Sequence, residues 1–291
     1  MTLGPPLLAC NVHATTLEFT LLVAFGSLLA GLLGALTGLG GGVIIVPFLT
    51  LLLHVDIRYA IGASLVSVMA TSSGAAAAYL REGYSNMRVG MLLEVATSIG
   101  AICGAYLATC IPTGAIAVVF GLVLLYSAWT SVKPIPDVSA GESLDPLAQG
   151  LRLDGTYPTP EGLIEYHVRH VPAGFVLMYV AGAASGLLGI GSGAVKVLAM
   201  DRVMRIPFKV STTTSNFMIG VTAAASAGIY LHRGYIDPGL AMPVMLGVAA
   251  GALSGARILP GAKVRTLRVA FGAALAAIAM QMIYQGMGGK I

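Results

Sequence analysis

Long apolar runs, separated by short polar stretches, dominate the pattern of this chain. Eight runs have close to the ~20 residues that a helix needs to cross a bilayer, and they cover 17–36, 57–80, 89–109, 114–132, 171–188, 207–231, 238–255 and 269–287. Two further runs, 43–54 and 194–204, have about a dozen residues, and a helix of that length covers under about 20 Å. The pattern predicts spanning helices together with two short segments that cannot cross the membrane unaided.

The overall composition supports a membrane setting. Hydrophobic residues make up 57 % of the 291 residues and charged residues only 10 %, and the mean hydropathy is +0.88. A soluble globular domain has about 25 % charged residues. This composition excludes an ordinary soluble protein and favours a polytopic membrane protein.

The second half of the chain repeats the first at one fixed offset, the one that carries Gly38 onto Gly189. Glycine, serine and tyrosine positions all take part, and the matches extend from the glycine clusters to the last apolar run of each half. They include Gly38 with Gly189, Gly40 with Gly191, Gly42 with Gly193, Ser64 with Ser215, and Tyr79 with Tyr230. The general likeness of Gly/Ala-rich membrane helices is an alternative, but one offset that unites different residue types favours an internal duplication.

The distribution of basic residues indicates how the two copies are oriented. If each half has five segments, its copy is inverted in the membrane, and loops on one side then carry 12 of the 16 Lys and Arg residues, with 3 on the other side and Lys196 inside an apolar segment. Four segments per half would divide the loop residues almost evenly. Because basic residues mark the cytoplasmic side, we expect five segments per half, both termini outside and the central loop in the cytoplasm.

The predicted fold class is therefore an all-α polytopic membrane protein with two inverted repeats of about five transmembrane segments each. One short or broken segment, entered through glycines, belongs to each repeat. Residues 1–132 form the N-terminal repeat (segments 1–5), 133–170 a polar cytoplasmic linker, and 171–291 the C-terminal repeat (segments 6–10). The cysteines and histidines lack metal-ligand spacing, so no metal site and no cofactor are expected.

Two glycine clusters precede the short segments and are candidate binding elements. Glycines leave helical geometry at low cost, and the backbone N–H groups that they free are tolerated in hydrocarbon only where they face protein, water or a ligand. A helix N-terminus at that point attracts anions. The predicted substrate-binding residues are Gly38, Gly40, Gly41 and Gly42 in the first half and Gly191, Ser192 and Gly193 in the second. Close helix packing is the alternative role for these glycines.

These motifs resemble those of the TauE/SafE family of sulfite and organosulfonate exporters. The resemblance rests on GLGGG with Pro47 after it, on AIGAS ending at Ser64, and on the second copy GIGSG with STTTS ending at Ser215. It covers nearly the whole chain outside the central loop and implies a membrane transporter that exports small anions. The second half departs from the usual pattern, because AVKVLAMD replaces the apolar, proline-containing stretch after the glycines.

Lys196 in that divergent stretch is the first polar candidate within the apolar segments. A charge at the bilayer centre costs at least about 2.5 kcal/mol, so such a residue usually faces a cavity and has a partner. An anionic substrate is one partner. Snorkelling to the interface and pairing with Asp201 are the alternatives.

Hydroxyl, amide and carboxyl groups complete the candidate set. Ser64, Ser215 and Asn216 are predicted to help bind an oxyanion, with helix capping and interhelical hydrogen bonds as alternatives. Thr222 has a weaker claim. Glu94 is a candidate for proton coupling, and a hydrated glutamate or a pair with Arg88 is the alternative.

The sequence thus predicts a membrane transporter, an exporter of sulfite or organosulfonates, with a midplane anion site between the repeats. A passive anion channel and a membrane-embedded lipid-phosphate enzyme are the alternatives, and the enzyme lacks a clustered acid, base or nucleophile. The expected partners are a small anionic substrate, membrane lipids and a second copy of the chain in a homodimer. No nucleic-acid partner is expected, because no basic patch is interleaved with aromatics.

Overall fold

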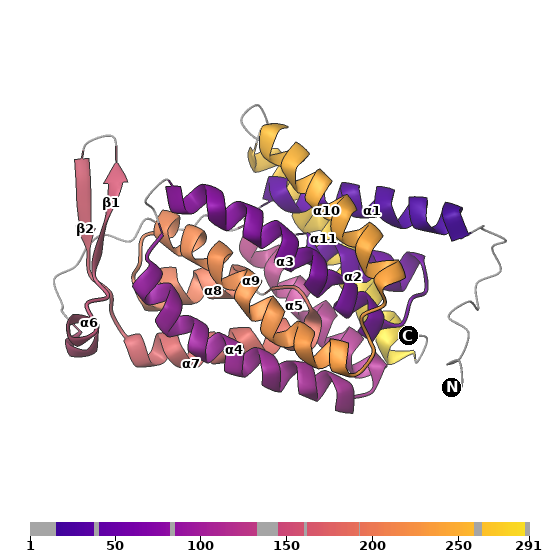
Figure 1. The fold of residues 1–291 in the computed structure, drawn as a ribbon, viewed down its shortest axis with the longest axis horizontal. Helices are drawn as coiled ribbons and strands as arrows, with labels where there is room; N and C mark the ends of the chain where they lie inside the picture. The colour runs from indigo at the N-terminus through magenta and orange to yellow at the C-terminus, as the bar shows by residue number, and fades with distance from the viewer. Residues whose placement is uncertain are drawn as a thin grey trace.

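The structure, a computed structural model, describes residues 16–37, 41–81, 85–132, 145–159, 162–191, 193–258 and 264–288. This part of the chain is predominantly helical (Figure 1), as predicted. The first half contains α1 (Thr16–Thr37), α2 (Gly42–Pro47), the π-helical turn η1 (Phe48–Leu52), α3 (Ile57–Arg81), α4 (Met87–Cys110) and α5 (Thr113–Val132). The second half contains α7 (Val171–Leu188), α8 (Gly193–Leu198), the π-helical turn η2 (Ala199–Val203), α9 (Phe208–His232), α10 (Pro238–Ile258) and α11 (Val264–Met287).

The helix bounds recur at the offset found in the sequence. Moving both ends of α2, η1 and α3 along the chain by that offset gives the ends of α8, η2 and α9, and the first residues of α4 and α5 likewise give those of α10 and α11. Local backbone geometry recurs as well, since His54 (φ 52°) and Arg205 (φ 58°) occupy matching positions in the left-handed region. The repeated sequence therefore adopts the same order of local structures twice.

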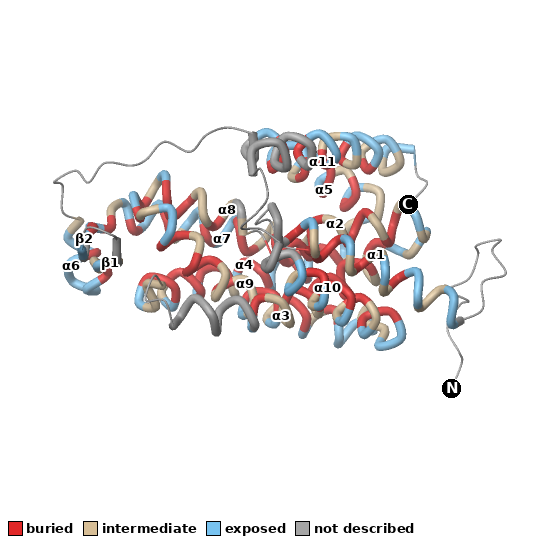
Figure 2. The backbone as a smooth tube through the Cα atoms, turned by 90° about the horizontal axis from the view of Figure 1, so that it is seen from above, coloured by how far each residue is buried: buried red, intermediate tan, exposed pale blue. Residues whose placement is uncertain are grey.

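Several of these helices suit a bilayer. Three described helices are long and apolar enough to cross one, over Leu17–Gly34, Met87–Cys110 and Val171–Leu188, and shorter apolar helices cover Gly42–Leu52, Thr113–Trp129 and Pro238–Ser254. Buried positions lie mainly where helices face one another, whereas exposed positions mark their outer sides (Figure 2). Large apolar side chains such as Leu21, Phe25 and Tyr106 are among the exposed ones, as expected for a surface that contacts lipid. The number of segments that cross the bilayer stays a prediction.

The main helix pairs join one half of the chain to the other. Helix α1 packs along α10, α4 along α7, α3 along α9, and α5 along α11, and the α5–α11 pair lies to one side of the other helices (Figure 2). Glycines allow close approach: a Cβ on Gly104 of α4 would overlap the carbonyl oxygen of Ala183, and one on Gly251 of α10 would overlap that of Leu28. Small residues let helix backbones meet in this way in membranes.

Part of the predicted linker forms regular structure at one end of the molecule (Figure 1). It contains α6 (Pro146–Gly150) and an antiparallel hairpin of β1 (Gly155–Thr159) and β2 (Gly162–Tyr166). Leu153 and Val168 are buried in one cluster with residues from the first turns of α4 and α7. Residues 133–144 of the predicted linker lie outside the described residues.

Side-chain hydrogen bonds attach this segment to both halves. The Asp145 carboxylate accepts hydrogen bonds from the backbone N–H groups of Leu147 at 3.0 Å and Val171 at 3.1 Å, so it caps α6 and α7 together. Asn86, at the start of α4, donates through Nδ2 to the Leu153 carbonyl at 2.8 Å. The segment therefore ties α4 of the first half to α7 of the second.

Candidate functional site

The two glycine segments meet inside the molecule. A Cβ on Gly42 would lie 2.8 Å from Ser64 Oγ and 3.1 Å from the carbonyl oxygen of Gly189, so this part of the first cluster contacts the start of the second. Ser64 Oγ donates to that Gly189 carbonyl at 2.7 Å. Gly41 lies beside Val248. Three predicted site residues, Gly38, Gly40 and Ser192, lie outside the described residues.

A matching arrangement surrounds the second short helix. Ser215 Oγ donates to the Gly193 carbonyl at 3.4 Å, as Ser64 Oγ does to the Gly42 carbonyl at 3.5 Å. Gly191 has φ 70°, a conformation that favours glycine, and a Cβ there would lie 2.9 Å from the Ile219 side chain. The glycines thus provide both the bend before α8 and its close contact with α9.

Asn216 lies where α9 crosses α3. Its backbone carbonyl accepts a 2.5 Å hydrogen bond from Ser72 Oγ. A Cβ on Gly220, one turn further along α9, would also meet Ser72 Oγ, at 2.8 Å. The predicted residues of α9 therefore lie at a contact between the two halves.

Lys196 on α8 is completely buried. Its relative exposure is 0 %, and its Nζ donates to Thr222 Oγ1 of α9 at 2.5 Å. The side chain therefore does not snorkel to an interface. An ammonium has three N–H donors, and Thr222 accepts one of them.

Glu94 on α4 shares the same hydroxyl group. Its Oε1 accepts from Thr222 Oγ1 at 2.8 Å and from Ser98 Oγ at 2.9 Å. Within the described part of the chain, its Oε2 is buried without a hydrogen-bond partner. Arg88 donates instead to the Arg152 carbonyl at 3.2 Å, so Glu94 is connected to Lys196 through one threonine.

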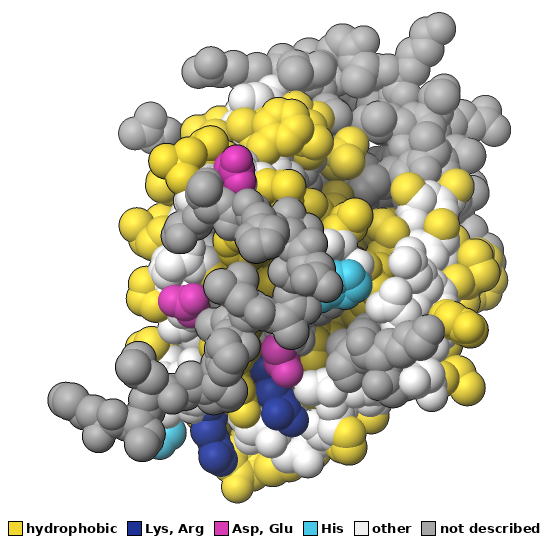
Figure 3. All heavy atoms as spheres, turned by 90° about the vertical axis from the view of Figure 1, so that its right-hand side faces the viewer, with side chains coloured by type: hydrophobic (Ala, Val, Ile, Leu, Met, Phe, Trp, Pro, Cys, Tyr) yellow, Lys and Arg dark blue, Asp and Glu magenta, His cyan; other side chains and the backbone are white. Residues whose placement is uncertain are grey.

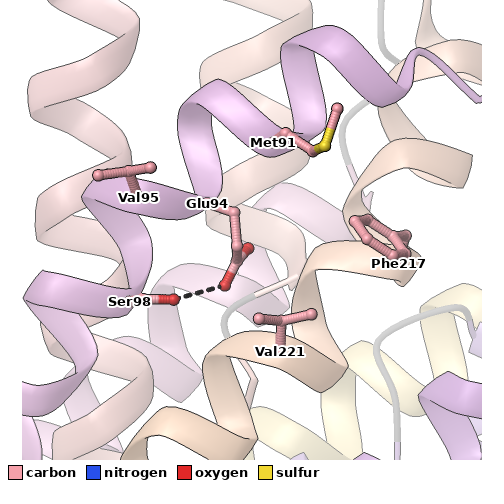
Figure 4. A pocket seen from close by; sticks show the side chains of 6 residues that line it. All are labelled: Met91, Glu94, Val95, Ser98, Phe217 and Val221. Atoms are coloured by element: carbon pink, nitrogen blue, oxygen red, sulfur yellow. Dashed lines mark hydrogen bonds between the residues drawn. The ribbon is translucent and has the colours of Figure 1, made fainter.

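Glu94 also lines a groove on the outer side of α4 and α9 (Figure 4). The groove has a volume of about 360 Å³, and its lining residues are Met91, Glu94, Val95, Ser98, Phe217 and Val221. The carboxylate lies between the two helices in Figure 4, with the apolar side chains around it. Glu94 itself is 8 % exposed, so a buried carboxylate borders an open, largely apolar surface.

Ser98 is the member of this network that sequence reasoning missed, and Thr222 was only a minor candidate. Thr222 follows Ser215 by seven residues and Ser98 follows Glu94 by four, so each lies on the same helix face as a predicted residue. That spacing was a usable signal for each helix alone. It did not show that α4, α8 and α9 converge.

Comparison with known proteins identifies the family. A family model for the sulfite exporter TauE/SafE matches residues 23–282. The chain belongs to the TauE/SafE family. It is 26 % identical over 283 residues to the probable membrane transporter protein YunE of Bacillus subtilis (strain 168), covering 93 % of this chain and 99 % of that protein.

Two further relatives have similar names. The probable membrane transporter protein YdhB of Bacillus subtilis (strain 168) is 26 % identical over 238 residues, covering 81 % of this chain and 89 % of YdhB. The probable membrane transporter protein ORF9 of a Sinorhizobium species is 24 % identical over 253 residues, covering 85 % of each chain. No solved structure matches the chain. This TauE/SafE member is accordingly a membrane transporter and not an enzyme.

Proposed function

We propose that this TauE/SafE transporter exports a small anion, sulfite or an organosulfonate, through a site between two inverted five-segment repeats. The helix bounds that recur in the second half of the chain support the repeats. The beginning of α1 and the end of α11 lie toward one end of the molecule, and the hairpin lies at the opposite end (Figure 1). An odd number of segments in each half accounts for that arrangement, because the first half then ends on the side opposite its start and the second half returns the chain to the starting side.

The charge distribution supports an orientation with the hairpin in the cytoplasm and both termini outside. Basic residues of the described chain accompany the hairpin and the neighbouring helix ends: Arg88, Arg152, Arg169, Arg202, Arg205 and Lys209. The opposite end, where α1 begins, has scattered charges among hydrophobic side chains (Figure 3). The positive-inside rule assigns the basic end to the cytoplasm.

The buried ammonium of Lys196 is the observation that carries the anion site. A buried amine is costly unless it is paired, and its remaining N–H donors suit an anion. The Ser64 bridge to Gly189 supports this site as well, because it joins the two glycine segments, and Lys196 lies on the helix that begins at the end of the second segment. Such donors can follow the several acceptor lone pairs of a sulfonate or sulfite without adding charge.

Anion binding to the purified protein tests this proposal. Sulfite, sulfate, thiosulfate, taurine, sulfoacetate, acetate and phosphate would be compared by thermal shift and calorimetry. The decisive variant is Lys196→Gln, which removes the charge and keeps a hydrogen-bond donor for Thr222. Lys209→Gln is the matched control at the start of α9.

The expected result is that a sulfonate or sulfite stabilises the wild type and Lys209→Gln, and that Lys196→Gln loses most of this effect. A Lys196→Gln protein that binds as tightly as the control would remove Lys196 from the site. If no anion of the panel binds to the wild type, the anion transporter itself is the wrong proposal.

A further inference from the structure

A buried cation and a buried carboxylate are joined by a single neutral hydroxyl. Lys196, Thr222 and Glu94 come from three different helices, α8, α9 and α4, and they are 0 %, 0 % and 8 % exposed. A lysine and a glutamate in their charged forms sum to zero. This balance is the condition under which two charges are tolerated away from water.

The donor and acceptor roles of these groups limit where the protons can lie. Lys196 can only donate, so Thr222 Oγ1 accepts at 2.5 Å, and the one hydroxyl proton of Thr222 is left to donate. Glu94 Oε1 at 2.8 Å and the Met218 carbonyl at 2.8 Å are its acceptors. Ser98 Oγ donates to the same Oε1. Oε1 can thus accept from two hydroxyl groups, whereas Oε2 has no hydrogen-bond partner among the described residues and is the oxygen free to take a proton.

We propose that one proton binds Glu94 for each monovalent anion that binds Lys196, so that anion and proton occupy the site together. This inference rests on the proposed anion site. An anion at Lys196 would leave the site with one net negative charge, which is costly in a buried position. A proton from the aqueous phase that forms an O–H bond at Oε2 restores neutrality, and it dissociates when the anion leaves.

The requirement that the occupied site be neutral also specifies the substrate class. A monovalent anion together with a protonated Glu94 and a charged Lys196 gives a neutral site. A dianion such as sulfate leaves one negative charge even after Glu94 is protonated. The site therefore selects sulfonates and hydrogensulfite over sulfate and hydrogenphosphate dianions.

The groove between α4 and α9 borders Glu94. Glu94 lies seven residues after Met87, the first residue of α4, which places it about 10 Å along the helix from the end that bears the hairpin. Met91 and Phe217 line the groove toward that end. Glu94 thus lies closer to the hairpin end of α4 than to its other end at Cys110.

The surrounding titratable groups leave Lys196 as the partner of Glu94. In the described chain, few titratable groups face Glu94 from the neighbouring elements. Lys196 comes from α8, and the α9 residues that contact the Glu94 carboxylate do not titrate. On α4, Arg88 donates to a carbonyl beside the hairpin. On α7, Tyr179 lies beside Cys103, more than two turns further along α4. Asp201, buried in η2, belongs to the turn that packs against α7 and α9.

Calorimetry on the wild-type protein tests the stoichiometry without any variant. Methanesulfonate binding would be measured in buffers that differ in their enthalpy of ionisation, because the dependence of the observed heat on that enthalpy counts the protons taken up. We expect about one proton per anion, and an affinity that weakens by about tenfold per pH unit once Glu94 is ionised in the free protein. Binding without proton uptake overturns the inference while it leaves the anion site intact.

The Glu94→Gln variant tests which group takes the proton. Glutamine has the shape of the protonated acid and cannot ionise, so methanesulfonate should bind this variant without proton uptake and with the same affinity at all pH values. Glu165→Gln, an exposed carboxylate on β2, is the matched control and should behave as the wild type. In liposomes, Glu94→Gln should exchange methanesulfonate yet fail to accumulate it against a pH gradient.

The outcomes separate the two proposals. A Glu94→Gln protein that still takes up a proton with the anion assigns the coupling to another group and overturns this inference. Equal binding of sulfate and methanesulfonate also contradicts it. If the wild type binds neither anion at any pH, the proposed anion site itself fails.

Discussion

Thr222 is the residue whose replacement tests the buried network most directly. Valine has nearly the same shape as threonine and lacks the hydroxyl, so Thr222→Val removes the acceptor of Lys196 and a donor to Glu94 without opening a cavity. The two hydrogen bonds, at 2.5 Å and 2.8 Å, both involve charged groups. We expect the substitution to reduce the free energy of unfolding by about 2–4 kcal/mol, because hydrogen bonds to charged groups contribute about 1.5–3 kcal/mol each and the stranded groups relax in part.

Thr50→Val is the matched control for this experiment. Thr50 is 3 % exposed, and its hydroxyl donates to the Val46 carbonyl of its own helical segment at 2.8 Å. Losing such a local bond costs about 1 kcal/mol. Reversible unfolding in mixed micelles would give the free energy of unfolding of both variants. A double-mutant cycle of Thr222→Val with Glu94→Gln would isolate the coupling energy between Thr222 and Glu94.

The expected pattern is a large loss for Thr222→Val, a small one for Thr50→Val, and a smaller effect of Thr222→Val once Glu94 is already glutamine. Equal losses in the two threonine variants would refute the reasoning. So would a cycle in which the effects of Thr222→Val and Glu94→Gln simply add, because the hydroxyl would then contribute nothing specific to the ion pair.

Three other substitutions test the packing of α4 on α7, the bend before α8 and the Asp145 cap of α7. Gly104→Ala should lower thermal stability by several degrees, because its Cβ would overlap a carbonyl oxygen of α7, well inside the 3.4 Å at which ordinary contact begins, and overpacking costs about 1–3 kcal/mol. Gly191→Ala should lose transport activity, since its φ of 70° costs an alanine about 1–2 kcal/mol. Asp145→Asn should remove an acid-sensitive attachment of the hairpin, measured by hydrogen exchange at the start of α7. The Val171 N–H lowers the pKa of Asp145 below its ordinary value of 3.8, so the carboxylate stabilises the fold above that pH and the contribution is lost as the pH falls through the lowered pKa.

Each of these has its own control and its own contrary result. Gly228→Ala on α9 has open space around the new Cβ and should keep activity and gain slightly in stability. Equal melting of the Gly104→Ala and Gly228→Ala proteins would contradict the packing argument, and normal transport by Gly191→Ala would show that the bend is not required. Asp145→Asn should have the same hydrogen-exchange protection factor at neutral and acidic pH, and a variant that keeps the acid response of the wild type would assign that response to another group.

Much of the helical order could be predicted from apolar runs and one sequence offset. The predicted short segments correspond to α2 with η1 and to α8 with η2, because length alone distinguishes them from spanning helices. Lys196 stood out since a charge within an apolar segment is costly. Its surroundings could not be predicted, because they depend on how α8 packs against α9 and α4.

Other features depended on packing that a sequence pattern does not encode. The polar stretch before α7 reads as a linker because prolines, glycines and charges dominate it, yet Leu153 and Val168 are buried against helix ends. A few apolar residues suffice when two helices provide the other half of a small core. The repeat and the AIGAS motif predict Ser64 as a ligand residue, but neither reveals that its hydroxyl bridges to Gly189 of the other half.

The exchange of partners between the halves has a consequence for how the chain is made. Helix α1 begins at Thr16, whereas α10, the helix that it packs along, begins only at Pro238. At about 5–20 residues per second, the ribosome needs roughly 10–40 s to cover that distance. During this time α1 has left the ribosome while the glycine-lined partner surface of α10 does not yet exist. The first half is thus held in an unfinished state until the end of synthesis, and a chain truncated before α10 leaves α1 without its partner.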